Sequence, residues 1–296
     1  MADLLVTRKD GIYVDGTLGG GGHSLRILEK LEGRGRLIGL DQDPEAIQFA
    51  RQTLKNYSDR FVLSATRFSM LKNVLDKEAV REINGILFDL GISSHQIDQP
   101  LRGFSFQKEG PLDMRMDPST FLTAEKIIHE YPLERLTKIF RDYGEERWAS
   151  KISEAICQYR KTTRIDSTLK LVRIVTQVIP PPQSIKTLAR VFQAIRIEVN
   201  RELQELEEGL RVASDRLIAG GRICVIAYHS LEDRIVKNKF QFLSQSCICP
   251  PAVLQCQCGG KASYHKVNKK VIRPSVAETN LNPRSRSARL RVIERN

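Results

Sequence analysis

The sequence predicts an α/β fold in which an all-helical insert interrupts a parallel sheet, and three observations support this prediction. Over residues 1–90, short apolar strands alternate with amphipathic helices, a pattern typical of a parallel sheet covered by helices on both faces. Over residues 119–180, apolar residues recur at helical spacing and no convincing strand occurs. An apolar strand then returns at residues 222–230, so the chain is expected to re-enter the sheet after the insert.

Each element of the first part follows from its own pattern. Apolar runs bounded by polar residues or glycine predict strands at residues 11–15, 36–41, 61–64 and 83–91. Leucines at helical spacing predict a first helix over 23–31. A second helix is predicted over 44–57, because Pro44 suits the first turn and an apolar face follows it.

The change of pattern sets the expected domain boundaries. These are residues 1–116 with 186–296 for a discontinuous α/β domain, and residues 117–185 for the helical insert. We expect the insert to take part in substrate recognition. A long amphipathic helix over 186–218 is predicted to lead back to the sheet and to end at a pair of glycines.

The composition is that of an ordinary soluble globular protein, with 41% hydrophobic and 28% charged residues. We recognise no signal peptide and no apolar run long enough to cross a bilayer. We therefore expect a protein that does not bind membranes and is cytoplasmic, or lies in an organelle interior if a transit segment has been removed. The net charge is +12, and from Lys261 onward ten Lys and Arg stand against two Glu. This basic end favours a polyanion such as nucleic acid, whereas the alternative is a surface that only aids solubility.

Four of the six cysteines lie close together and raise the question of a metal site. They form two C-x-C pairs, Cys247 with Cys249 and Cys256 with Cys258. Such pairs can ligate zinc, but structural zinc sites usually have two to four residues between paired cysteines. We therefore favour reduced thiols and predict no metal.

The stretch YVDGTLGGGGHS, residues 13–24, lies between a predicted strand and a predicted helix and holds five of the nineteen glycines. The phosphate-binding pattern G-x-x-x-x-G-K-[ST] does not occur, and the dinucleotide pattern G-x-G-x-x-G fails in register. A third pattern, an acidic residue followed by glycines two, four and six positions later, is typical of methyltransferases. Asp15, Gly19 and Gly21 match this pattern, and Thr17 stands where its first glycine belongs.

An acidic residue at the end of the next predicted strand extends the match. Asp41 lies twenty residues after Gly21, and a carboxylate there accepts hydrogen bonds from the diol of an adenosine ribose. NAD and S-adenosylmethionine share that ribose, but NAD would place a pyrophosphate on the glycine loop. No cation stands near the loop to meet a phosphate, which favours S-adenosylmethionine. The alternative is a glycine turn that only packs its helix on the sheet.

Five stretches between residues 12 and 292 closely resemble the bacterial RsmH (MraW) family. They are YVDGTLGGGGHS, LFDLGISSHQIDQPLRGFSFQKEGPLDMRMD, FQAIRIEVNRELQELE, VIAYHSLEDRIVKNKF and NPRSRSARLR. The resemblance implies a Rossmann-like methyltransferase domain with a helical domain inserted after the fourth strand. It implies an S-adenosylmethionine-dependent enzyme that methylates N4 of a cytidine in the decoding centre, at the P site, of 16S ribosomal RNA.

The resemblance also implies a set of cofactor contacts. By position these are Gly21, Gly22, His23, Asp41, Phe68, Asp89 and Gln96. Phe68 is expected beside the adenine, and Asp41 on the ribose. Members of the family generally begin further upstream, with a His-x-Pro-Val stretch that is absent here. If Met1 is the true start, part of the rim of the pocket is expected to be missing.

Methylation of an amino nitrogen requires acceptors for its hydrogens and the loss of a proton. Asp89, at the end of the fourth predicted strand, is our candidate acceptor. The proline pair and the aromatic residue that many amino-methyltransferases carry there are missing, since the sequence reads DLGI. Phe104 and Phe106 are candidates for stacking on a base flipped out of the RNA.

His229 follows the strand that re-enters the sheet, and two interpretations of it stand. As a catalytic residue it would relay the proton, oriented by Glu232 or Asp233. As a structural residue it would cap the next helix together with Ser230. The reaction needs no metal on either interpretation.

The candidate contacts to RNA phosphates are arginines, because their charge and hydrogen-bond donors suit phosphate oxygens. They are Arg102, Arg115, Arg284, Arg286 and Arg289, of which the last three lie in a segment predicted to form a strand. For Arg115, an ion-pair ladder with Asp113 and Asp117 is the alternative. The expected partner is 16S ribosomal RNA within the 30S subunit or its precursor, and the protein is expected to be a monomer or a homodimer.

Three other functions remain open at this point. One is an NAD-dependent oxidoreductase, and another is a non-catalytic ribosome-assembly factor that binds RNA with a methyltransferase fold. The third is a DNA amino-methyltransferase, which the missing proline pair disfavours.

Overall fold

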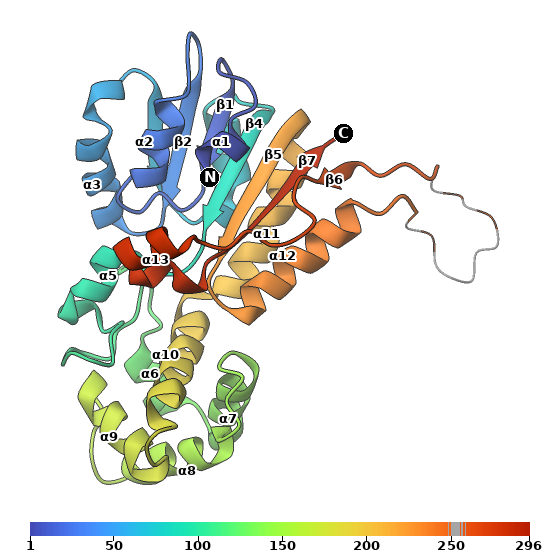
Figure 1. Ribbon diagram of the computed structural model, residues 1–296. Helices are drawn as coiled ribbons and strands as arrows, with labels where there is room; N and C mark the ends of the chain where they lie inside the picture. Colours follow the sequence, from blue (N-terminus) through green and yellow to red (C-terminus); the bar gives the residue numbers. More distant parts are fainter. Residues whose placement is uncertain (248, 250–254, 256, 258) are drawn as a thin grey trace. The chain divides into compact units, whose positions relative to one another are not determined.

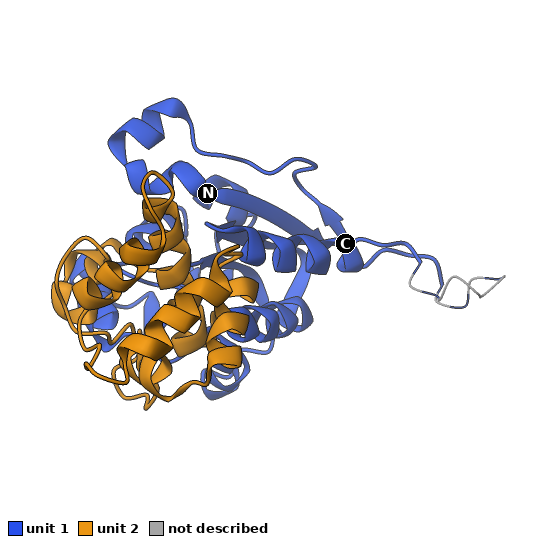
Figure 2. Ribbon diagram, turned by 90° about the horizontal axis from the view of Figure 1, so that it is seen from below, with its two compact units in different colours: residues 1–91, 203–296 blue, residues 92–202 orange. Residues whose placement is uncertain are grey.

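The computed structural model describes residues 1–247, 249, 255, 257 and 259–296. The chain forms two compact units, which Figure 2 shows in different colours. The first unit combines residues 1–91 with residues 203–296, and the second comprises residues 92–202. Both boundaries expected from the sequence, after residues 116 and 185, fall inside the second unit.

A seven-stranded sheet organises the first unit (Figure 1), in the order β3-β2-β1-β4-β5-β7-β6. The strands are β1 (Ile12–Asp15), β2 (Arg36–Asp41), β3 (Phe61–Ala65), β4 (Ile83–Asp89), β5 (Leu217–Ala227), β6 (Tyr264–Lys266) and β7 (Arg289–Arg295). Strands β1 to β5 run parallel, whereas β7 is antiparallel to β5 and to β6. This arrangement confirms the predicted α/β fold and each of the predicted strands from residues 1–90.

Helices cover both faces of this sheet, as the alternating pattern predicts. One face packs against α1 (Ala2–Leu5), α2 (Gly22–Leu28) and α3 (Pro44–Thr53). The other packs against α4 (Leu71–Lys77), α11 (Glu202–Arg216) and α12 (Ser230–Leu243). Neighbouring residues of β1 divide between the two cores, Tyr13 facing the first set of helices and Val14 the second. Short elements complete the unit: η1 (Lys55–Tyr57), η2 (Phe68–Met70), α13 (Val276–Leu281) and η4 (Pro283–Ser287).

The strand order places a topological switch point between β1 and β4. From β1 the chain continues to β2 on one side, and from β4 it eventually reaches β5 on the other. Connections that leave in opposite directions open a crevice at the carboxyl ends of the two strands, where such sheets bind ligands. The glycine-rich stretch follows β1 and Asp89 ends β4, so both belong to this edge.

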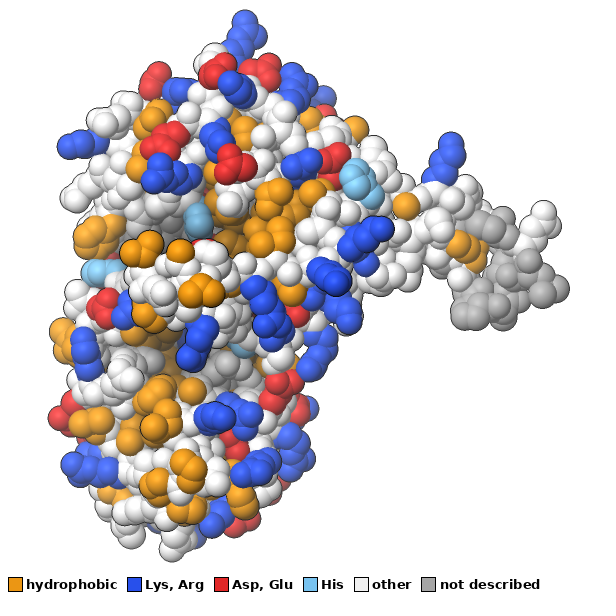
Figure 3. Space-filling view, viewed as in Figure 1, with side chains coloured by type: hydrophobic (Ala, Val, Ile, Leu, Met, Phe, Trp, Pro, Cys, Tyr) orange, Lys and Arg blue, Asp and Glu red, His pale blue; other side chains and the backbone are white. Residues whose placement is uncertain are grey.

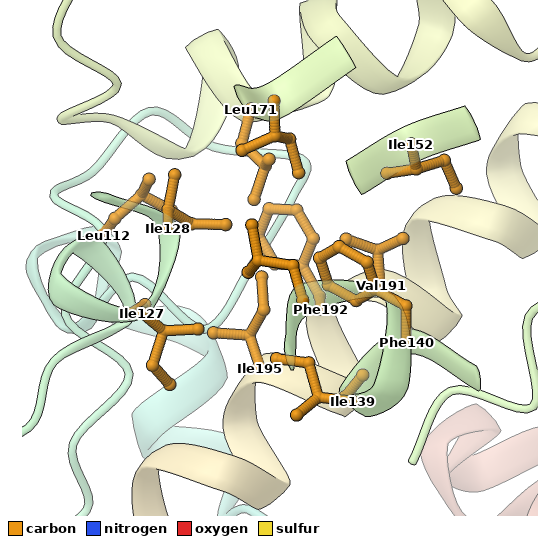
Figure 4. Packing of buried hydrophobic residues seen from close by; sticks show 14 of the residues in the cluster. Leu112, Ile127, Ile128, Ile139, Phe140, Ile152, Leu171, Val191, Phe192 and Ile195 are labelled. Carbon is orange, nitrogen blue, oxygen red and sulfur yellow. The ribbon is translucent and has the colours of Figure 1, made fainter. Parts of the chain in front are cut away.

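The second unit is built from helices, as the sequence predicts. They are α5 (Ser94–Asp98), η3 (Pro100–Arg102), α6 (Ala124–Glu130), α7 (Leu133–Asp142), α8 (Ala149–Tyr159), α9 (Thr168–Val178) and α10 (Ser184–Asn200). Residues 92–202 contain no β-strand, only an isolated bridge between Pro111 and Ser167. The apolar faces of α6 to α10 meet in a hydrophobic core of their own (Figure 4).

The prediction of a single helix over 186–218 is wrong, because two helices meet at Arg201. Arg201 has a positive φ of 55°, which ends α10, and α11 begins at the next residue. The Asn200 side chain fixes this end by accepting from Met116 N and donating to Met114 O, both at 2.8 Å. Strand β5 then starts at Leu217, before the glycine pair, which lies in an irregular part of the pairing with β4.

The strand predicted around Arg284 and Arg286 is also only partly correct. Pro283 opens the η4 turn, which the Asn282 side chain caps by accepting from Arg284 N at 3.2 Å. Arg284 and Arg286 therefore lie on a turn, and β7 begins only at Arg289. None of the helices in the described part of the chain has the length and apolar character needed to span a bilayer.

Candidate functional site

The glycine-rich loop is organised by the buried carboxyl group of Asp15. Asp15 accepts hydrogen bonds from Ser24 Oγ at 2.7 Å and from Thr17 N at 3.2 Å. These contacts tie the end of β1 to the first turn of α2. Burial raises the pKa of this carboxyl group above its usual range. Asp15, the acidic residue of the methyltransferase pattern, thus holds the two ends of the loop together by hydrogen bonds.

Two glycines of the loop have backbone angles that favour glycine, and two others have no neighbouring atoms where a side chain would begin. Gly19 and Gly21 have positive φ angles of 50° and 80°, and a Cβ on Gly21 would lie 3.3 Å from Ala50 Cα. A Cβ on Gly20 or Gly22 would meet no atom within 4 Å, so these two positions face open space. The loop therefore presents bare backbone at the switch point.

Thr17 connects the two strand ends at the switch point. Its Oγ1 accepts a hydrogen bond of 2.6 Å from the backbone N–H of Asp89. Gly16 N donates to Leu87 O at 2.8 Å, so the loop is joined to the end of β4 at two places. The hydroxyl explains why threonine suits the position where the pattern has its first glycine.

Asp41 holds the glycine loop from the end of β2. Its two oxygens accept hydrogen bonds from Gly19 N at 2.8 Å and from Asp43 N at 2.9 Å. Burial raises the pKa of the Asp41 carboxyl group to about 6. The carboxylate predicted to bind a ribose thus lies against the loop predicted to bind the rest of the cofactor.

The carboxylate of Asp89 lies between a histidine and a tyrosine. His23 Nε2 is 3.3 Å from Oδ2, and Tyr228 donates its hydroxyl to Oδ1 at 3.0 Å. The hydrogen bond to Asp89 raises the pKa of His23. Burial is the main cause that raises the pKa of Tyr228, which therefore stays protonated at neutral pH. His23 and Asp89 come together as expected for one site.

Sequence reasoning missed Tyr228, although it stands beside a residue that was considered. The available signal was its place directly after β5, at the same edge of the sheet as Asp89. The neighbouring His229 is the stronger sequence candidate for proton transfer, because the ordinary pKa of histidine lies near neutral pH.

The structure supports the capping interpretation of His229. His229 is the N-cap of α12, and its ring lies against Glu232, with Nε2 3.1 Å from Oε1. Glu232 in turn accepts from the backbone N–H groups of Tyr228 and His229, at 2.9 and 3.3 Å. Asp233 does not orient His229, because its carboxylate binds Arg289 and Arg291.

The remaining candidate cofactor residues divide between the two units. Phe68 belongs to the first unit and packs edge-on against Phe88, with 5.3 Å between ring centroids. Gln96 belongs to the second unit, where it is buried and forms a capping box with Ser93 at the start of α5.

Both candidate stacking residues, Phe104 and Phe106, pack in the core of the second unit. Phe104 is buried, and the Phe106 ring lies against Phe192 with 5.6 Å between centroids. Core packing is therefore the role the structure gives them.

Two of the five candidate phosphate-binding arginines hold their own loop in the second unit. Arg115 binds the Asp113 carboxylate through Nε at 2.9 Å and Nη2 at 2.7 Å, while its Nη1 donates to two backbone carbonyls. Arg102 Nη2 donates to Arg115 O and Met116 O, at 3.1 and 3.0 Å. The ion pair with Asp113 fits one half of the ladder considered for Arg115, whereas the Asp117 carboxylate accepts from Ser119 N and Oγ.

The three C-terminal candidates differ from one another in their surroundings. Arg289 forms an ion pair of 3.1 Å with Asp233, whereas Arg284 and Arg286 are exposed on η4. Of the four clustered cysteines, Cys256 and Cys258 lie outside the described residues. Reduced thiols without a metal therefore stay a prediction from the sequence.

Comparison with known proteins gives a match over the whole chain. The family described as the MraW methylase family matches residues 1–296. The Ribosomal RNA small subunit methyltransferase H of Heliobacterium mobile is 46% identical, over 99% of this chain and 95% of that protein. The protein of the same name from Halothermothrix orenii is 45% identical over the same shares of the two chains.

Among solved structures, a putative rRNA-methylase from Clostridium thermocellum aligns over 100% of this chain and 95% of that one, with 14% identity and a TM-score of 0.44. The full-length family match and the identity to the curated relatives agree with the glycine loop and the strand-end carboxylates described above, and the chain belongs to the MraW methylase family.

Proposed function

We propose that this protein is an S-adenosylmethionine-dependent methyltransferase that methylates N4 of a cytidine in 16S ribosomal RNA. The observation that carries the proposal is the full-length match to a methylase family whose relatives are named as small-subunit ribosomal RNA methyltransferases. The cytidine N4 and the P site of the decoding centre come from the resemblance of the sequence motifs. A ribosomal RNA substrate also implies action in the cytoplasm, on the 30S subunit or its precursor.

The residues at the carboxyl edge of the sheet fit S-adenosylmethionine. Asp41 offers a carboxylate for a ribose diol at the end of β2, and its partial burial raises the pKa of this group. Gly20 and Gly22 leave room for a ligand to approach the backbone of the loop. Phe68, on η2 after β3, is the candidate contact to adenine, and Gln96 of the second unit is a further candidate from the family resemblance.

The cofactor would supply an electrophilic methyl group, so the protein has to position the acceptor nitrogen and receive its proton. Asp89 is the proposed acceptor of an N4 hydrogen, because it ends β4 at the switch point and its carboxylate is partly exposed. Its backbone is fixed by Thr17, so the acceptor does not depend on a mobile loop. We assign His229 to the structure of α12 rather than to proton transfer.

The exposed basic residues near the end of the chain are the proposed contacts to RNA phosphates. Arg284 and Arg286 on η4 are exposed, as are the cations of the segment before it, Lys269, Lys270 and Arg273. Figure 3 shows further Lys and Arg side chains gathered over the region of α12. We leave Arg102 and Arg115 out of this proposal, and Arg289 has a second role in holding Asp233.

One experiment tests the proposal against its alternatives. Small-subunit RNA is incubated with the protein and methyl-deuterated S-adenosylmethionine, digested, and analysed by mass spectrometry. We expect one labelled methyl group on N4 of a cytidine. Binding of S-adenosylhomocysteine without any labelled nucleoside would point to a non-catalytic assembly factor, and thermal stabilisation by NAD alone would point to an oxidoreductase.

A further inference from the structure

We propose that Tyr228 is a positioning residue for methyl transfer, and that its hydroxyl holds the Asp89 carboxylate in the orientation that receives the amino group. The inference rests on the proposed function, because it gives Tyr228 a role in that same site. Tyr228 is not among the residues that the family resemblance implies as contacts.

The sheet brings Tyr228 to Asp89 through adjacent strands. Strands β4 and β5 lie side by side (Figure 1), Asp89 pairs with Ile226 in their parallel ladder, and Leu90 N donates to Ile226 O at 2.9 Å. Tyr228 follows two residues later, just beyond the end of β5. The separation of the two side chains is thus set by backbone pairing in the middle of the sheet.

The start of α12 fixes the backbone of Tyr228 as well. Glu232 is almost fully buried and accepts from Tyr228 N at 2.9 Å, while His229 caps the same helix end. Beside the ring, a Cβ on Gly91 would lie 3.7 Å from Tyr228 Cδ2, an ordinary contact distance. Both the main chain and the ring of Tyr228 are therefore held in place.

Each oxygen of the Asp89 carboxylate then has its own neighbour. Tyr228 donates to Oδ1 at 3.0 Å, and His23 Nε2 lies 3.3 Å from Oδ2. Because the half-buried tyrosine stays protonated, its hydroxyl acts as a donor toward the carboxylate. Contacts to both oxygens fix the torsion angle of the Asp89 carboxylate. An acceptor of fixed orientation can then hold the amino group in the geometry that methyl transfer requires.

The other charged groups near this carboxylate do not replace the hydroxyl. Asp15 carries the same sign and is already bonded to Ser24 and Thr17. Glu232 is engaged with the backbone before α12. Tyr228 is thus the group that contacts Oδ1 in the described part of the structure.

The test is Tyr228→Phe, which removes one oxygen and keeps the ring. Tyr57→Phe is the matched control, since Tyr57 is also a half-buried tyrosine, lies on η1 and is not among the residues assigned to the site. Single-turnover methylation of 30S subunits gives the rate of transfer, and calorimetry with S-adenosylhomocysteine gives cofactor affinity and confirms that each variant is folded.

We expect Tyr228→Phe to lower the single-turnover rate about 10-fold or more, as misplacement of a reacting group does. Its Kd for S-adenosylhomocysteine is expected to stay within about twofold of wild type, as for an uncharged group that does not touch the ligand. A wild-type rate overturns the inference, and so does a loss that lies entirely in cofactor affinity. A wild-type protein that leaves small-subunit RNA unlabelled overturns the proposed function, and this inference with it.

Discussion

Binding of S-adenosylmethionine is expected to weaken as the pH falls through about 6, because of Asp41. Burial raises the pKa of this carboxyl group from 3.8 to about 6. A shift of that size means that ionising the group costs about 3 kcal/mol more here than in water. A ribose diol donates hydrogen bonds to the carboxylate, favours its charged form and so lowers its pKa on binding.

The sign and the size of the effect follow from linkage. The free protein holds a proton on Asp41 below about pH 6, and that proton must leave when the ligand binds. If binding restores the ordinary pKa, Kd at pH 5 should be about 10-fold weaker than at pH 7, with about one proton released. Affinity is thus complete above pH 7 and is lost as the pH falls.

Calorimetry with S-adenosylhomocysteine, in buffers that differ in ionisation enthalpy, measures both the affinity and the proton release. Asp41→Asn is the control, because it cannot ionise and should bind weakly at both pH values without the pH-dependent step. Asp41→Asn keeps His23, whose pKa is raised by Asp89, so any effect of His23 on the pH dependence is the same in both proteins. Comparison of the two proteins therefore isolates the effect of Asp41. A wild-type Kd that is constant between pH 7 and pH 5, or a step of equal size in Asp41→Asn, would refute the reasoning.

Three further predictions concern single residues. Asp89→Ala should abolish turnover, and a single-turnover rate near wild type on 30S subunits would show that the proposed chemistry is wrong. His229→Ala should lower the free energy of unfolding in urea by about 0.5–2 kcal/mol, because the helix cap is lost. His229→Asn should keep both the cap and turnover. A loss of turnover in a stable His229→Asn variant would favour the interpretation of His229 as a proton relay. Replacing Arg284 and Arg286 together by alanine should lower the slope of log affinity for RNA against log salt by about 1 per lost phosphate contact. Arg8→Ala is the control, because Arg8 pairs with Asp10 before β1, at the opposite edge of the sheet from η4, and an equal slope in both variants would remove η4 from the interface.

The parallel sheet was accessible from the sequence because burial on both faces leaves a plain apolar signal, whereas the strand order with its switch point came from the structure. Strand β4 is buried along its whole length until Asp89 and is apolar apart from Asn84, and the buried part of strand β2 likewise ends at an aspartate, Asp41. The position of a carboxylate after a buried strand also predicts the edge of the sheet on which it lies. The glycine loop, Asp41 and Asp89 could be placed at that edge on this basis, whereas the other candidate cofactor contacts rest on the family resemblance.

Other features depend on contacts between distant residues and leave no local pattern. The break at Arg201 is fixed by the Asn200 side chain and by two backbone groups about 85 positions earlier in the chain, at Met114 and Met116, so local helix propensity continues across it. For Arg115 the sequence offered phosphate binding or an ion-pair ladder, and it carries no signal for the two backbone carbonyls that accept from its Nη1.

The position of the second unit between β4 and β5 has a consequence for biosynthesis. When β4 leaves the ribosome, β5 has not yet been synthesised, so the edge of β4 that pairs with β5 remains unpaired. An unpaired strand edge is prone to association with other chains. Residues 92–202 have a hydrophobic core of their own and can collapse during this delay. We expect early folding of that helical segment to shorten the effective chain between the two strands, and so to limit the entropic cost of closing the sheet.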